Sequence, residues 1–148
     1  MTPRRLLPAL AAACALAAVT PAAADAGRIP IRVAIGDQSI AMFDQPSFQA
    51  MKLERVRYLF PWNGMDDAQT RLAARAYVKR ARAAGMSVLI HLTTDDYTIK
   101  KAHLPSVATY RSKVRRLVPY FRALGVREFG AWDEANHASQ PTYRSPNH

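Results

Sequence analysis

Two neighbouring carboxylates, Asp133 and Glu134, are the residues of this sequence best suited to chemistry. They follow residues 127–132, in which Arg, Phe and Ala alternate with Glu, Gly and Trp, a pattern that predicts a strand. Asn136 and His137 come directly afterwards. A carboxylic acid at a strand end, beside an aromatic ring and an amide, suits acid/base chemistry on a polar substrate. The alternative is a solvated acidic loop, because only a minority of carboxylates have the perturbed acidity of a site.

The first 26 residues have the three parts of a secretory signal peptide. Two arginines near the start precede the apolar run Leu6–Val19, and small residues permit cleavage near Ala24 or Ala26. The run is too short to span a membrane comfortably. We therefore expect a secreted protein without a membrane anchor, whose single folded domain is residues 27–148.

Composition excludes several classes of site from that domain. The chain's one cysteine lies within the signal, so no disulfide, thiol nucleophile or thiolate metal site is expected. Loss of Arg4, Arg5 and Asp25 with the signal lowers the net charge from +10 to +9. The basic residues recur at helical spacing, as on solvated helix faces, and no nucleic-acid-binding motif accompanies them, so nucleic acid is not an expected partner. The two basic stripes are Arg71, Arg75, Lys79 and Arg82, and Arg111, Arg115 and Arg122.

Strands and helices are predicted to alternate along the domain. Short apolar or β-branched runs predict strands at 31–35, 55–60, 86–91 and 127–132. This order implies an α/β fold with a parallel sheet and right-handed crossovers. A (β/α)8 barrel, an open doubly wound sheet and a half-barrel all satisfy it. No glycine-rich phosphate loop follows a strand, so no nucleotide cofactor is expected.

Three helices are predicted between these strands. A short one follows Asp44, and a longer one runs from a cap at Asp66 or Asp67 to about Ala84. Its apolar side is predicted from Ala73, Tyr77, Ala81 and Ala84. The third begins at Pro105 and Ser106 and ends at Gly125. Pro119 lies inside it and is predicted to kink or split the helix.

Polar and aromatic residues follow each predicted strand at its C-terminal end. Asp37 follows the first strand, Trp62 the second, His91 closes the third, and residues 133–137 follow the fourth. Functional residues of parallel sheets lie at this end of the strands. Because polar or aromatic residues occur at the C-terminal ends of all four predicted strands, a functional site is favoured over loops that are polar by chance.

The run Trp132–His137, followed by Ser139–Thr142, resembles the end of strand four in clan A glycoside hydrolases, which are (β/α)8 barrels. The closest resemblance is to secreted bacterial glycoside-hydrolase-like proteins on the xylosidase and arabinosidase side of that clan. The segments Gly36–Gln38, Pro61-Trp62 and Pro105–Val107 are similar to that group as well. The resemblance implies a partial (β/α)8 barrel of about four strands that binds carbohydrate and needs no cofactor.

The resemblance also assigns roles to individual residues. Glu134 would be the general acid/base of a retaining mechanism, in which a second carboxylate attacks the anomeric carbon. Trp62 would stack on a sugar face, or is a packed aromatic; Asn136 would orient Glu134, or turns the chain. The expected substrate-binding residues are Asp37, Trp62, His91, Trp132, Asp133 and Asn136.

Two features depart from the family pattern. Asp133 stands where the family has Asn, and an ionised carboxylate cannot donate a hydrogen bond. The chain ends at His148, whereas a complete barrel takes about 250 residues, and no residue here corresponds to the family's nucleophile on strand seven. We therefore expect the N-terminal half of a barrel that is inactive alone and that self-associates through exposed edges.

Other hypotheses remain open. The protein could be a non-catalytic secreted carbohydrate-binding protein, or a half-barrel that pairs with itself or with a separate second half. Glu134 and His137 have the Glu-x-x-His spacing of di-iron bundles, but one copy without further helices predicts no metal site.

Overall fold

The computed structural model describes residues 33–98 and 101–144. The predicted signal peptide and the first two residues of the predicted strand 31–35 lie outside this part of the chain. The elements, in chain order, are 3-10 helix η1 (Ile40–Asp44), α1 (Pro46–Ala50), β1 (Arg55–Pro61), η2 (Gly64–Asp66), α2 (Ala68–Ala83), β2 (Ser87–Thr93), α3 (Val107–Ala123), β3 (Glu128–Gly130) and η3 (Pro141–Arg144).

The three strands form one parallel sheet in the order β1-β2-β3, which confirms the predicted α/β class. Val56 of β1 lies opposite Val88 of β2, and Ile90 of β2 lies opposite Phe129 of β3. The prediction of four strands is not met within the described residues. Where strand 31–35 was expected, a single parallel bridge joins Ile35 to β1.

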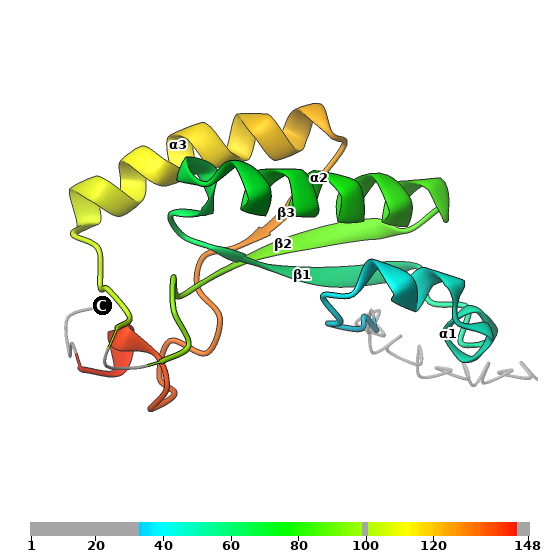
Figure 1. Ribbon diagram of the computed structural model, residues 1–148, viewed down its shortest axis with the longest axis horizontal. Coiled ribbons are helices and arrows are strands. Elements are labelled where there is room, and N and C mark those ends of the chain that lie inside the picture. The colour runs from blue at the N-terminus through cyan, green and yellow to red at the C-terminus, as the bar shows by residue number, and fades with distance from the viewer. Residues whose placement is uncertain (1–32, 99–100, 145–148) are drawn as a thin grey trace, which may run out of the picture. The chain divides into compact units, whose positions relative to one another are not determined.

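Both long helices cover the same face of the sheet (Figure 1). Alternate residues of β1 and β2 point to this face, because successive side chains of a strand point to opposite sides. The aromatic rings of Phe60 and Phe121 meet nearly at right angles with centroids 5.0 Å apart, which ties α3 to β1. Burial of each such side chain contributes about 2 kcal/mol. The core includes Val56, Phe60, Val88, Ile90 and Leu92 from the strands, and Tyr77, Val78, Leu117 and Phe121 from the helices.

The ends of α2 lie where the sequence predicts them. Asp67 is the N-cap, and its carboxylate accepts a hydrogen bond from the Thr70 amide at 2.6 Å. Gly85 follows the helix with a φ of +77°, a conformation that glycine adopts without steric cost. The predicted apolar side was partly wrong, because Ala73 is exposed and Ala74 is buried in its place. Ala84, also predicted to face the core, is the exposed C-cap.

Helix α3 continues through Pro119, so of the predicted kink or split the split does not occur. Pro119 lies on the exposed side of the helix, as does Arg115, whose carbonyl loses its helical partner. Water can satisfy that carbonyl, and the apolar face packs undisturbed on the sheet. Ser106 caps the helix: its hydroxyl accepts from the Thr109 amide at 3.1 Å.

No helix of the described residues covers the second face of the sheet, which we call the open face. The side chains of the open face are half-buried and mostly polar or charged: Arg55, Arg57, Leu59, Ser87, Leu89, His91, Glu128 and Gly130. Arg55 of β1 pairs with Glu128 of β3 at 2.6 Å across the width of this face. The polar end of the open face, near the C-terminal ends of the strands, positions the candidate site.

Candidate functional site

A cluster of three side chains lies at the C-terminal end of the open face. One guanidinium nitrogen of Arg57, from β1, donates to Oδ1 of Asp133 at 2.9 Å. Nδ1 of His91, from β2, lies 3.3 Å from the same oxygen but is not aligned for a hydrogen bond. β1 and β2 thus contribute one residue each, and the segment after β3 contributes the third. We call Arg57, His91 and Asp133 the carboxyl-edge cluster.

The carboxylate of Asp133 is the centre of this cluster because the backbone fixes it there. The Asp133 amide donates to the carbonyl of Leu92 at 2.7 Å, which continues the β2–β3 pairing beyond the last residue of β3. The Asp133 side chain is 10 % exposed and that of Arg57 is 38 % exposed. A buried carboxylate needs such a partner, because desolvation of an unpaired charge is costly.

Gly130 makes room for the His91 imidazole. These two residues are register partners on β3 and β2. A methyl group at position 130 would lie 2.1 Å from Cδ2 of His91 and 2.6 Å from Nε2, far inside contact distance. The ring therefore lies against the backbone of β3. The buried Nδ1 of His91 has no hydrogen-bond partner within the described residues, which is uncommon for a buried polar atom.

Glu134, the predicted acid/base, comes directly after the cluster and is exposed. Its φ is +49°, a left-handed conformation that costs a non-glycine residue about 1 kcal/mol. The Glu134 carbonyl accepts from the His137 amide at 2.8 Å, which closes a tight turn. Asn136 is exposed in this turn, and no hydrogen bond of its side chain to Glu134 is present. Glu134 thus follows the carboxyl-edge cluster in the chain and is exposed to solvent.

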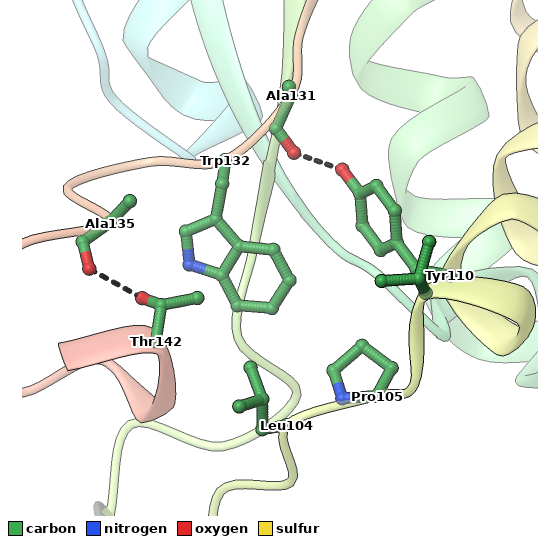
Figure 2. A pocket seen from close by; sticks show the side chains of 8 residues that line it. Leu104, Pro105, Tyr110, Ala131, Trp132, Ala135 and Thr142 are labelled. Carbon is green, nitrogen blue, oxygen red and sulfur yellow. Dashed lines mark hydrogen bonds between the residues drawn. The ribbon is translucent and has the colours of Figure 1, made fainter. Parts of the chain in front are cut away.

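Trp132 points away from the cluster and toward α3, because it precedes Asp133 by one residue in extended chain. Figure 2 shows its indole in an apolar pocket of about 190 Å³ between the start of α3 and the loop after β3. The indole Nε1 donates to Oε1 of the buried Gln140 at 3.1 Å. We call this cavity the Trp132 pocket. Its lining is Leu104, Pro105, Val107, Tyr110, Ala131, Trp132, Ala135 and Thr142.

Trp62 and Asp37, also predicted to bind substrate, do not join the cluster. Trp62 follows β1, where its amide donates to the Thr93 carbonyl at 3.0 Å. The residue as a whole is 8 % exposed, so it offers little open ring face for a sugar to stack on. Asp37 is exposed, and its carboxylate accepts from the Ser39 amide at 2.7 Å, which fixes a local turn.

The sequence prediction missed Arg57, Gly130 and Gln140. The signal for Arg57 is period-two alternation: Arg55 and Arg57 alternate with Val56 and Tyr58, which places both arginines on the face opposite the core. A glycine inside a strand can mark the close approach of another group, which is the case at Gly130. We find no signal in the sequence for Gln140, because its burial depends on the folding of the loop after β3.

Neither a metal centre nor a membrane helix is found among the residues that the structure describes. No group of three or more His, Cys, Asp or Glu side chains there is placed to hold a metal ion. No helix in these ranges has the length and hydropathy needed to cross a membrane.

The chain matches no protein-family model, no curated protein and no solved structure. Membership of the glycoside hydrolases therefore stays a prediction from the sequence.

Proposed function

We propose that this chain is the N-terminal half of a secreted (β/α)8 barrel of the glycoside-hydrolase type, which acts on carbohydrate with Glu134 as general acid/base. The supporting observation is the position of the carboxyl-edge cluster. It lies on the open face where β3 ends, directly before Glu134, and the long side chain of Arg57 reaches it from the first half of β1. Barrel enzymes bind their substrates at this end of the strands.

The topology supports the same proposal. The strand order β1-β2-β3 follows the chain, and α2 and α3 both pack on one face. A doubly wound sheet reverses its strand order and carries helices on both faces. A barrel instead keeps every helix outside and turns the second face inward. On this proposal the open face becomes the barrel interior, in which the Arg55–Glu128 pair is enclosed.

The chemistry assigned to Glu134 is proton transfer at the glycosidic oxygen. Its carboxylic acid protonates the leaving oxygen as a second carboxylate attacks the anomeric carbon, and its anion then activates the water that hydrolyses the glycosyl-enzyme. Asp133 is a poor candidate for that second carboxylate, because it is buried and bound to Arg57. The proposal therefore takes the nucleophile from a later strand, outside the described residues.

A specific observation favours a second candidate, a secreted carbohydrate-binding protein without catalysis. No hydrogen bond or ion pair to a described side chain holds the Glu134 carboxylate, which lies in solvent. Asp133, at the position where the family has Asn, directs Oδ1 to Arg57 instead of leaving it free for a sugar hydroxyl. Binding with no turnover is the outcome that this candidate predicts.

An external nucleophile can test the role of Glu134 without the missing carboxylate. Azide attacks the anomeric carbon of a phenyl glycoside, the carbon–oxygen bond breaks, and Glu134 supplies the proton that phenol takes away. Phenoxide is a poor leaving group, so its departure depends on protonation by Glu134. We expect glycosyl azide from the purified chain, and about 100-fold less product from Glu134→Gln, within the range typical of general acids.

The matched control is Glu54→Gln, the same change at an exposed glutamate just before β1. It should leave the yield of glycosyl azide unchanged. Equal yields from Glu134→Gln and the parent chain would contradict the acid/base role. Glycoside binding detected by calorimetry with no azide product from any phenyl glycoside would favour the non-catalytic candidate.

A further inference from the structure

The Trp132 pocket has apolar walls whose polar atoms already have partners. The Tyr110 hydroxyl donates to the Ala131 carbonyl, and the Thr142 hydroxyl donates to the Ala135 carbonyl at 2.6 Å (Figure 2). The Trp132 indole nitrogen donates to Gln140 at 3.1 Å. A sugar entering this pocket would lose water from its hydroxyl groups and find few partners in return. The pocket therefore suits an apolar group.

The size and shape of the pocket fit one planar ring. Its volume of about 190 Å³ compares with the ~150 Å³ of an apolar cavity that binds benzene. The rings of Tyr110 and Trp132 are tilted by 44° with centroids 5.8 Å apart. Leu104 and Pro105 lie on another side of the same space (Figure 2). A flat aromatic ring offers its edge or face to both aromatic side chains.

A positive charge follows the pocket on the same face of α3. Val107, in the lining, is 61 % exposed and so marks the opening. Arg111 follows it by four residues on α3, a spacing that puts two side chains on the same helix face. Arg111 is exposed and forms no salt bridge within the described residues. An acidic group on the ring would meet this guanidinium.

We propose that the Trp132 pocket binds an aromatic carboxylic acid, with the ring beside Trp132 and the carboxylate toward Arg111. The pocket lies on the α3 side of the loop after β3, separate from the carboxyl-edge cluster on the open face. The proposal therefore does not depend on Glu134 or on any activity toward glycosides.

Titration with benzoate, followed by the indole N–H signals in ¹H–¹⁵N NMR spectra, tests the proposal. The chain has two tryptophans, so Trp62 serves as an internal reference. We expect the Trp132 signal to shift with a dissociation constant in the millimolar range, as is usual for so small a ligand. Benzyl alcohol, which keeps the ring and lacks the charge, and cyclohexanecarboxylate, which keeps the charge and lacks the flat ring, should bind more weakly.

Two pairs of variants separate the ring from the charge. Arg111→Gln should weaken benzoate binding about two- to fivefold, the effect of one exposed ion pair, whereas Arg115→Gln, one turn further along α3, should not. Val107→Glu should abolish binding by putting a negative charge at the mouth, whereas Ala108→Glu should leave it within twofold. An unmoved Trp132 signal in the folded protein, or equal binding of cyclohexanecarboxylate, would overturn the proposal.

Discussion

At the scale of single residues, Gly130 gives the His91 imidazole its place beside Asp133. The ring occupies the space that a side chain at position 130 would need. Because position 130 has no side chain, two residues that are 39 positions apart in the chain can pack against each other. It also explains why a glycine stands within a strand, where glycine otherwise weakens the pairing.

Gly130→Ala should therefore destabilise the protein, by about 1–3 kcal/mol as for other overpacked sites. Most of this loss should disappear in a His91→Ala background, because the shorter side chain removes the clash and the two changes are not additive. The free energy of unfolding from urea denaturation measures both effects.

The matched background is Leu89→Ala. Leu89 lies on the same face of β2 two residues before His91 and is opposite Glu128, so shortening it should not rescue Gly130→Ala. An equal cost of Gly130→Ala in all three backgrounds would show that the imidazole does not occupy this space.

At the scale of elements, the start of α3 is fixed to the segment after β3 by one half-buried phenol, that of Tyr110. Burial raises the pKa of Tyr110 to about 12, and its hydroxyl donates to the Ala131 carbonyl. The folded pKa is thus above the ordinary value of 10.0. The stability that this tyrosine contributes is complete below pH 10.0 and is lost as the pH rises through about 12.

Tyr110→Phe should cost about 1 kcal/mol at neutral pH, the net value of one hydrogen bond, and should reduce the fall in stability between pH 10 and 12. Burial also raises the pKa of Tyr58 and of Tyr77, so part of the alkaline loss should remain. Urea unfolding across this pH range measures the difference. The control Tyr97→Phe, at a phenol that is 63 % exposed, should keep the parent profile; an unchanged slope in Tyr110→Phe would contradict the assignment.

Local chemistry predicted most element boundaries, because the caps act within a few residues of the chain. Asp67, Ser106, Gly85 and Gly125 stand where the structure begins or ends a helix, and both glycines have positive φ. Whether Pro119 would interrupt α3 could not be predicted from neighbouring residues. It depends on which side of α3 faces water, which packing against the sheet decides.

The candidate site was predicted only in part, because its geometry depends on pairs distant in sequence. The sequence directed attention to Asp133, and the rule that functional residues follow parallel strands predicted that His91 lies at the same edge. Arg57 is 76 residues from Asp133, and only the sheet register shows that they meet. Trp132 was predicted to bind substrate together with Asp133, but strand alternation points it to the opposite side of the sheet.

At the scale of the whole molecule, the open face and the outer edge of β3 are surfaces that folded proteins usually cover. The outer edge of β1 is partly protected: the Leu59 amide donates to the Gln38 side chain at 3.0 Å, and the Arg57 amide donates to the Ile35 carbonyl at 2.8 Å. The edge of β3 has no strand partner within the described residues. Leu59 and Leu89 are the two leucines of the open face, and they lie opposite His91 and Arg57, respectively.

A sheet with this open face should self-associate, because pairing two copies removes Leu59 and Leu89 from water. We expect the purified chain to sediment as a concentration-dependent mixture, and Leu89→Lys to shift it to the monomer with unchanged circular dichroism. Lysine at this position faces Glu128, so the fold should accept it. Leu72→Lys is the control, since Leu72 is 56 % exposed on α2 and should have no effect on association. A parent chain that is monomeric at every concentration would show that other residues of the protein cover the open face, and would direct the search to them.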